Sequence, residues 1–191
     1  MSVFQILMLA VTAFFAYKVY EHINTLEDPP EPTPSRDSLS SFDPEALMAK
    51  ADDAVQEEDF KRAAALLQEA HAKAPDNTEI LNKLGFVLAH NGDLKAAIET
   101  YAQSLRIDDN DDVTHNAIAS LYRRTSEFEK ARQHYERALE IDDTYEITYY
   151  NFANLLVQTG EKEKAVTMYE KALELKSDFN EAAEELQKLR E

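Results

Sequence analysis

The stretch that decides the fold is residues 146–179, EITYYNFANLLVQTGEKEKAVTMYEKALELKSDF. Apolar residues at helical spacing lie on both sides of Gly160, which predicts two helices joined by a tight turn. In the second of these helices, Ala165 and Ala172 place small side chains on either side of Tyr169. Small residues at such spacing are typical of a helical hairpin in which the two helices approach each other closely.

The same hairpin recurs upstream with a step of 34 residues, beginning at Pro44. Small residues mark the second helix of each unit at Ala63, Ala97, Ala131 and Ala165, and again at Ala70, Ser104, Ala138 and Ala172. A larger residue stands between each pair, at Leu67, Tyr101, Tyr135 and Tyr169, and the first helices carry small residues at Ala51, Gly85, Ala119 and Ala153. Small residues at these points let helices pack about 8 to 10 Å apart while the larger side chain fills the adjacent space.

This pattern resembles the tetratricopeptide repeat (TPR), whose period is 34 residues and whose consensus runs W-x2-L-G-x2-Y, then A-x3-F, then P. The resemblance covers residues 44–177. Leu47, Leu81, His115 and Tyr149 fill the leading aromatic position, and the closing proline survives only as Pro75. The resemblance implies an all-α fold, a right-handed α-solenoid of four TPR hairpins followed by a C-terminal capping helix.

The register predicts a TPR domain over residues 44–191, with repeats at 44–77, 78–111, 112–145 and 146–179 and a capping helix at 180–191. Asp43 followed by Pro44 predicts a capped helix start. The first helices are expected at about 44–57, 78–91, 112–125 and 146–159, and the second helices at about 61–74, 95–108, 129–142 and 163–176.

The two ends of the array depart from the pattern of its middle, as expected where a repeat lacks a neighbour. Lys50 stands where the other units place a large hydrophobic residue. After the fourth unit, Phe179, Ala183, Leu186 and Leu189 predict an apolar helical stripe, whereas Gln187 occupies the small-residue position. A bulky side chain at that position cannot receive another hairpin, so this last helix is predicted to cap the array.

Composition excludes several classes of chemistry. The chain has a net charge of -17, which argues against nucleic acid as a partner because phosphate binding needs clustered Lys and Arg. No cysteine is present, which excludes disulfides, zinc thiolate sites and cysteine nucleophiles. HExxH, GxSxG, Walker A and GxGxxG motifs are also absent. We therefore expect no enzyme activity, no cofactor, no metal and no small-molecule substrate.

The acidic stretch of residues 107–115, IDDNDDVTH, invites comparison with a calcium loop. Val113 stands where an EF-hand loop needs glycine, and Ala119 stands where it needs a bidentate glutamate. We interpret the stretch as a solvated turn in which Asp111 or Asp112 caps the next helix. His115, at the leading aromatic position, is interpreted as a packing residue and not as a metal ligand.

The resemblance implies that the first helix of each repeat lines a concave face on which partner peptides lie. Transferred by position, the candidate peptide-groove residues are Asn82, Phe86, His90, Asn116, Ser120, Arg123, Arg124, Tyr150, Asn154 and Gln158. Amides pair with a peptide backbone, rings hold apolar side chains, and arginine clamps a carboxylate.

Arg123 and Arg124 stand out in so acidic a chain, so an acidic peptide or a C-terminal carboxylate is one hypothesis. The alternative is pairing with Glu127, Glu129 or the Asp-rich turn. Family members that hold chaperone tails do so with Lys, Asn and Arg at set positions. Met48 and Asp52 occupy the first two of those positions, which is a mismatch.

Residues 1–23 predict a single transmembrane anchor, because Val3–Tyr17 is interrupted only by Gln5 and Thr12. A cleaved signal peptide is the alternative, although no Lys or Arg precedes Val3. Residues 24–43, rich in proline and acids, predict an extended linker. The expected location is the inner (plasma) membrane, and Lys18 favours a cytoplasmic body, with the periplasmic side as the alternative.

Together these features predict a membrane-tethered scaffold or adaptor that binds a partner peptide or protein in the concave TPR groove. A periplasmic assembly factor or holding chaperone on the same scaffold is the first alternative. An enzyme and a self-assembling structural protein are further alternatives.

Overall fold

The computed structural model describes residues 43–191, and the predicted anchor and almost all of the predicted linker lie outside this range. The described residues form helices and no strands. These are α3 (Pro44–Gln56), α4 (Phe60–Lys73), α5 (Thr78–His90), α6 (Leu94–Ile107), α7 (Asp112–Arg124), α8 (Phe128–Ile141), α9 (Glu146–Gln158), α10 (Lys162–Leu175) and α11 (Asn180–Arg190). Each predicted helix boundary in the four repeats lies within one residue of the observed one.

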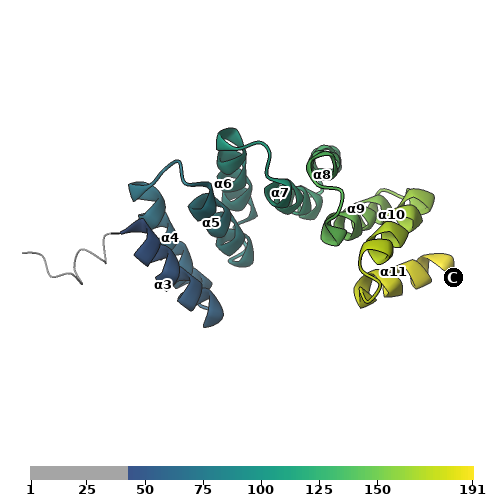
Figure 1. Cartoon of the computed structure of the whole chain (residues 1–191), viewed down its shortest axis with the longest axis horizontal. Coiled ribbons are helices and arrows are strands. Elements are labelled where there is room, and N and C mark those ends of the chain that lie inside the picture. The colour runs from purple at the N-terminus through teal and green to yellow at the C-terminus, as the bar shows by residue number, and fades with distance from the viewer. Residues whose placement is uncertain (1–42) are drawn as a thin grey trace, which may run out of the picture. The chain divides into compact units, whose positions relative to one another are not determined.

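The helices pack in consecutive pairs, which are α3 with α4, α5 with α6, α7 with α8, and α9 with α10 (Figure 1). Helix α11 packs against α10. The first helices also contact one another, because α7 touches both α5 and α9. We call the side formed by α3, α5, α7 and α9 the inner face. This arrangement confirms the predicted stack of helical hairpins.

Side-chain caps set the start of helices α3 to α7. Asp43, Asp59, Asn77, Asp93 and Asp111 each accept a hydrogen bond from a backbone N–H in the first turn of the following helix. These bonds satisfy N–H groups that have no partner within the helix. The predicted cap before Pro44 is therefore confirmed, and Asp111 is the residue of the acidic turn that caps α7.

The turn inside each hairpin needs a left-handed residue at the same position. Gly92 and Gly160 have φ angles of 85° and 81°, respectively. The equivalent residues in the first and third repeats are Glu58 and Ser126, with φ angles of 58° and 64°. Residues other than glycine rarely adopt this backbone conformation, so the turns at Glu58 and Ser126 carry strain that the turns at Gly92 and Gly160 avoid.

The repeated small residues lie where the helices meet. Ala63, Ala97, Ala131 and Ala165 are all fully buried, with 0% of their surface exposed. At Gly85, a Cβ atom would come within 2.9 Å of the Tyr101 ring. The spacing seen in the sequence therefore reflects contacts too close for larger side chains.

The ends of the array follow the prediction with one correction. Lys50 is exposed at the first repeat and Gln187 is exposed on α11. Ala182 and Leu186 of α11 are buried, whereas Ala183, which was expected in the apolar stripe, is exposed. Phe179 and Leu186 are buried and Leu189 is partly buried as expected, so only the alanine of the stripe differs. Residue 182 lies four positions before Leu186 and therefore on the same face of the helix.

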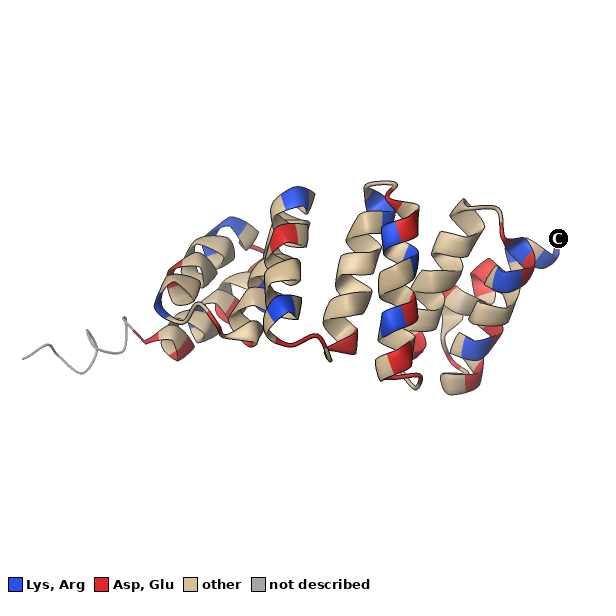
Figure 2. Cartoon of the chain, turned by 90° about the horizontal axis from the view of Figure 1, so that it is seen from above, with Lys and Arg blue, Asp and Glu red and all other residues tan. Residues whose placement is uncertain are grey.

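Lys, Arg, Asp and Glu residues are distributed along the helices and in the turns of the repeats (Figure 2). Within residues 43–191, no helix is both long and apolar enough to span a bilayer. The predicted anchor lies outside the described residues, so it remains a prediction.

Candidate functional site

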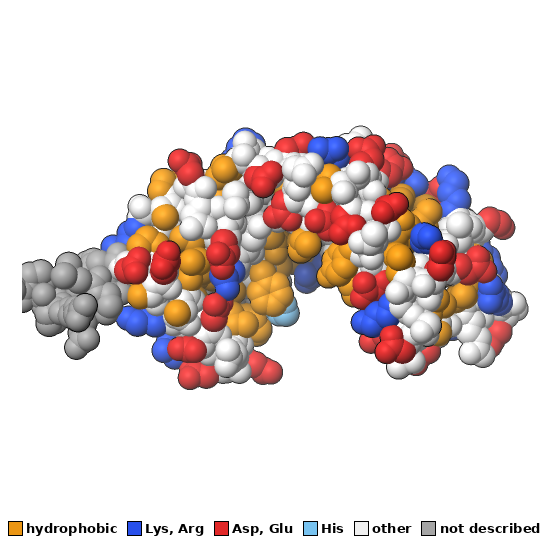
Figure 3. All heavy atoms as spheres, viewed as in Figure 1, with side chains coloured by type: hydrophobic (Ala, Val, Ile, Leu, Met, Phe, Trp, Pro, Cys, Tyr) orange, Lys and Arg blue, Asp and Glu red, His pale blue; other side chains and the backbone are white. Residues whose placement is uncertain are grey.

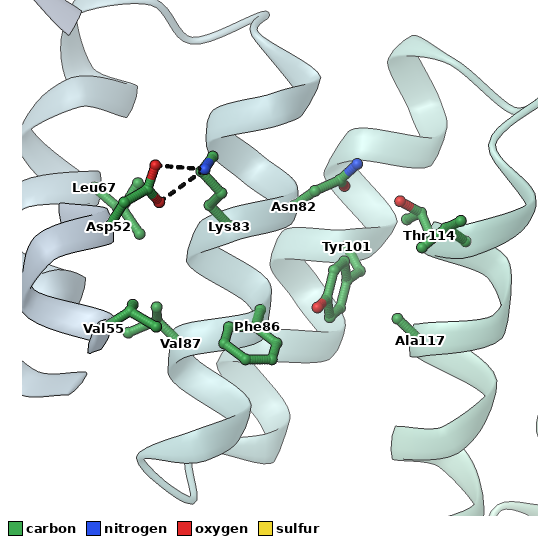
Figure 4. Close-up of a pocket in the computed structure, with 11 residues that line it drawn as sticks. Asp52, Val55, Leu67, Asn82, Lys83, Phe86, Val87, Tyr101, Thr114 and Ala117 are labelled. Carbon is green, nitrogen blue, oxygen red and sulfur yellow. Dashed lines mark hydrogen bonds and ion pairs between the residues drawn. The ribbon is translucent and has the colours of Figure 1, made fainter. Parts of the chain in front are cut away.

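A pocket of about 380 Å³ opens on the inner face of the first three repeats. Its lining residues come from five helices and are Asp52, Val55, Leu67, Asn82, Lys83, Phe86, Val87, Tyr101, Val113, Thr114 and Ala117. In Figure 4, Phe86 and Tyr101 lie between the residues of α3 on one side and those of α7 on the other.

Most of the pocket lining is apolar and part of it is unusually exposed. Phe86 is 44% exposed and Val113 is 55% exposed, whereas Leu67 and Val87 beneath them are almost completely buried. Hydrophobic side chains line the hollow on the lower side of the repeats in Figure 3. An exposed apolar depression with a fixed floor is the usual form of a site that receives an apolar group.

An ion pair borders the pocket at the α3–α5 contact. Lys83 Nζ lies 2.7 Å from Asp52 Oδ1 and 2.9 Å from Asp52 Oδ2 (Figure 4). Because these two charges neutralise each other, this rim does not favour a ligand of either sign.

Asn82 supplies a hydrogen-bond acceptor that is unsatisfied among the described residues. Its Nδ2 donates to Asp111 Oδ2 at 2.9 Å, while its Oδ1 is buried and has no partner among the described residues. A buried carbonyl oxygen without a donor is unfavourable, so a ligand N–H that reached Asn82 would gain from satisfying it.

Tyr101 contributes a neutral ring to the pocket. Burial raises the pKa of its phenol well above the usual value, and the nearby charge of Asp111 raises it further. The phenol therefore stays protonated in the physiological range, and the wall that it forms carries no charge.

The structure brings three of the predicted groove residues together at the first two repeats. Asn82 and Phe86 line the pocket. His90 lies beside Phe86, with 4.3 Å between ring centroids, and stacks on Phe60 at 4.7 Å. His90 therefore extends the aromatic surface beyond the pocket.

Three other predicted residues form hydrogen bonds within the protein. Asn116 is buried and accepts from Asn151 Nδ2 at 3.2 Å. Ser120 Oγ lies 2.9 Å from the Tyr135 hydroxyl, and the Tyr169 hydroxyl donates to Asn154 Oδ1 at 2.6 Å. These bonds reduce the capacity of the three side chains to bind a ligand.

The remaining residues of the fourth repeat differ in their surroundings. Tyr150 packs against Tyr169 and Phe179, with ring centroids 5.9 Å and 5.0 Å away. Gln158 is exposed near the end of α9. Neither residue lines the pocket of the first three repeats.

Arg123 and Arg124 form no ion pair with any carboxylate among residues 43–191. The alternative that they pair with Glu127, Glu129 or the acidic turn is therefore wrong for this structure. Glu127 instead accepts from Lys130 and Thr125.

Arg123 lies beside a phenol. Burial raises the pKa of Tyr135, while the hydrogen bond with Ser120 and the charge of Arg123 partly oppose that shift. The Arg123 Nε atom is buried and has no partner among the described residues. Arg124, the next residue, is exposed.

His115 and His134 form a hydrogen-bonded pair between α7 and α8. Their Nδ1 atoms lie 2.9 Å apart, and His115 Nε2 lies 3.2 Å from the backbone oxygen of Asp109. This bond requires one of the two Nδ1 atoms to carry a hydrogen and the other to accept it. Among residues 43–191, no group of three or more metal-binding side chains is present.

The positions transferred from the family did not include several residues that line the pocket. Lys83, Thr114 and Ala117 lie outside the positions transferred from the family, and Leu67 and Tyr101 come from second helices. Gly85 could have indicated that Tyr101 lies at this site. A residue without Cβ in α5 leaves room for the Tyr101 ring of α6 to lie against that helix.

A family model described as tetratricopeptide repeat matches residues 76–144 and 113–178, which together span more than half of the chain. A search of curated proteins gave no match. Among solved structures, MamA protein matches with 24% identity and a TM-score of 0.69, covering 76% of this chain and 80% of that chain. This likeness shows the fold alone.

Two further solved structures are similar. YrrB, described as a TPR protein with an unusual peptide-binding site, matches with 20% identity and a TM-score of 0.68, covering 78% of this chain and 76% of that chain. The first TPR of Spaghetti (RPAP3), bound to HSP90 peptide SRMEEVD, matches with 26% identity and a TM-score of 0.58. It covers 59% of this chain and 90% of that chain. The matched repeats and the hairpin stack show that this chain belongs to the tetratricopeptide-repeat family.

Proposed function

We propose that the chain is a protein-interaction scaffold that binds an extended segment of a partner protein along its inner face. The pocket between α3, α5 and α7 carries the proposal, because it offers exposed apolar rings and side chains above a rigid floor. Asn82 Oδ1 adds an acceptor for a backbone N–H of the bound segment. The proposed mechanism is binding alone, without catalysis.

The similar structures support this proposal. YrrB is described with a peptide-binding site, and the RPAP3 repeat is described with a bound peptide. Both share the stacked hairpins that create an inner face in this chain.

The test uses a phage-displayed library of random short peptides, panned on the full chain in mild detergent. Affinities of the selected peptides are then measured for the wild type, Phe86→Ala and Ile107→Ala. Phe86 and Ile107 are both 44% exposed, but only Phe86 lines the pocket, so Ile107→Ala is a matched control.

We expect Phe86→Ala to weaken binding about tenfold or more, as loss of a central anchor does, and Ile107→Ala to leave it unchanged. Equal affinities for all three proteins, or no selected peptide at all, would overturn the proposal.

We further propose that residues 1–23 anchor this scaffold in the inner (plasma) membrane, with the repeats on the cytoplasmic side. The apolar run of Val3–Tyr17 and the position of Lys18 support this part. Protease treatment of spheroplasts tests it. The repeats should survive until the membrane is opened, whereas digestion in intact spheroplasts would place them on the outer side.

A further inference from the structure

We propose that a second pocket, between the second helices α6 and α8, binds an arginine side chain of a partner protein. The pocket has a volume of about 260 Å³. Ile98 of α6 and Tyr122 of α7 form part of its lining, and Thr125, Glu127 and Lys130 line it at the start of α8. None of its lining residues lines the pocket of the inner face, so this proposal is independent of the proposed peptide groove.

The next repeat contains the same interaction within the protein. Arg132 of α8 forms an ion pair with Glu161, just before α10, and its Cζ atom lies 5.9 Å from the centroid of the Phe152 ring. At the equivalent positions 34 residues earlier stand Ile98 and Glu127. The earlier repeat therefore keeps the carboxylate but has no arginine to pair with it.

The surroundings of the two glutamates match in detail. Thr125 Oγ1 donates to Glu127 Oε1 at 3.1 Å, and Lys130 Nζ donates to Glu127 Oε2 at 2.5 Å. The threonine and lysine at the same positions around Glu161 donate to it at 2.9 Å and 2.7 Å. Arg132 adds a third donor to Glu161 Oε1. A carboxylate oxygen can accept more than one hydrogen bond, so Glu127 Oε1 can accept the same third donor.

Glu127 is open to a donor from another molecule. Its side chain is 41% exposed, whereas that of Glu161 is 28% exposed beside Arg132. Ile98 has no polar atom and cannot donate to Glu127. The pocket thus offers an acceptor and space at the point where the next repeat places its own guanidinium.

The lining fits an arginine side chain along its length. Ile98 and Tyr122 are partly buried apolar side chains, which can contact the methylene groups of an arginine. A guanidinium is planar and less strongly hydrated than an ammonium group, so it is better suited to a partly desolvated carboxylate. Small-molecule sites typically measure about 300 to 1,000 Å³, so this smaller pocket suits a single side chain.

The charge of the protein favours a basic partner. The net charge of -17 attracts cationic groups to the surface. Lys130 does not prevent a second cation from binding Glu127, because Glu161 accepts from both Lys164 and Arg132. The predicted ligand is therefore an arginine on an exposed, basic segment of a partner protein.

The test titrates the tripeptide Gly-Arg-Gly, acetylated and amidated at its ends, into the full chain in uncharged detergent. NMR follows the isoleucine and threonine methyl groups. Matched peptides carry lysine or citrulline in place of arginine, because citrulline keeps the shape of the side chain without its charge. Glu127→Gln removes the acceptor. Glu129→Gln is the matched control, because Glu129 is exposed on α8, lies outside the pocket and forms no ion pair among the described residues.

A second variant, Ile98→Arg, supplies the guanidinium from within the chain. It copies the arrangement of Arg132 and Glu161, so it should occupy the pocket and exclude the peptide. Ile107→Arg is its control, because Ile107 is exposed and does not line this pocket. Thermal melts verify that each variant is folded.

We expect the arginine peptide to shift the Ile98 and Thr125 methyl signals saturably, with about fivefold weaker binding of the lysine peptide and none of the citrulline peptide. Affinity should fall about tenfold or more in Glu127→Gln and in Ile98→Arg, and stay unchanged in both controls. No saturable shift, shifts spread over many acidic sites, or unchanged affinity in either Glu127→Gln or Ile98→Arg would overturn the proposal.

Discussion

The inner face differs between its N-terminal and C-terminal parts. Around α3, α5 and the start of α7, exposed apolar side chains such as Phe86 and Val113 surround an open pocket. Around α9, the corresponding positions are occupied by residues bonded to second helices, as in the pairing of Asn154 with Tyr169. Both parts are built from the same 34-residue repeat, so the difference comes from the side chains at equivalent positions.

The two parts also differ in packing. The most extensive buried cluster runs through α7 to α11 and includes the fully buried Ala131, Tyr135 and Tyr169. The first repeats form smaller clusters with the pocket among them. The C-terminal repeats thus contribute the more extensive buried cluster, while the N-terminal repeats leave an open pocket on the inner face.

Placing the same substitution in each part tests this difference most strongly. Ala131→Leu should overpack the C-terminal cluster and reduce the free energy of unfolding by about 1 to 3 kcal/mol. The larger side chain of Ala117→Leu would extend into the pocket, so this variant should change the free energy of unfolding by less than about 0.5 kcal/mol while weakening peptide binding. Denaturant unfolding measures both variants. Equal stabilities for Ala131→Leu and the wild type would contradict the assigned packing.

A smaller effect is expected from pH through the α7–α8 hairpin. Burial, followed by the proximity of His115, lowers the pKa of His134 to about 4 from 6.5, although Asp109 opposes the shift. The unfolded chain therefore binds a proton more readily than the folded one between these values. The contribution of His134 to the free energy of unfolding is fully present above pH 6.5. It falls by about 1 to 2 kcal/mol as the pH falls towards 4.

Unfolding free energies measured across this pH range for the wild type and His134→Gln test the expectation. The difference between the two proteins should shrink on acidification. His90→Gln, which alters a histidine outside the pair, should retain the wild-type slope. A wild-type slope that persists in His134→Gln would assign the pH dependence to other groups.

Removal of a single hydroxyl should distinguish the two parts by about 1 kcal/mol. Tyr169→Phe leaves Asn154 Oδ1 without its donor and should destabilise the fold by about 0.5 to 1.5 kcal/mol. Tyr101→Phe removes a hydroxyl that forms no hydrogen bond with the described residues, so its unfolding free energy should match the wild type within error. Equal losses in the two variants would show that the C-terminal part is not held by this bond.

The smallest predicted effect concerns the hairpin turns. Ser126→Gly relieves the left-handed conformation at φ 64° and should raise the free energy of unfolding by about 0.5 to 1 kcal/mol. Gly92→Ala introduces the same strain in the second repeat and should lower it by a similar amount. Thermal unfolding measures both, and a destabilised Ser126→Gly variant would contradict this account of the turns.

The sequence predicted the fold well because side-chain size repeats in it. A position that admits only alanine or glycine reports a close helix contact, and Gly85 against Tyr101 shows how close that contact is. The caps could also be predicted, because a capping side chain such as Asp111 bonds to a backbone N–H only a few residues away in sequence. The burial of Ala182 in place of Ala183 was not predicted, because Gln187 occupies the small-residue position in α11 and the repeat pattern gives no register there.

The candidate site could be predicted only in part. The positional rule located the helices that form the inner face, and it included Asn82 and Phe86. It could not show that Ser120 and Asn154 are bonded to tyrosines of second helices, because those partners lie 15 residues away in sequence. Availability for a ligand depends on such contacts, which only the structure shows.

The most direct test of the central claim is photo-crosslinking of a selected peptide to the full chain. A benzophenone amino acid placed at Val113, on the exposed rim of the pocket, is compared with one at Ile107, which is exposed outside it. The account predicts a crosslink from position 113 that unlabelled peptide competes away, and none from position 107. Equal crosslinking from both positions, or a crosslink from position 107 alone, would contradict it.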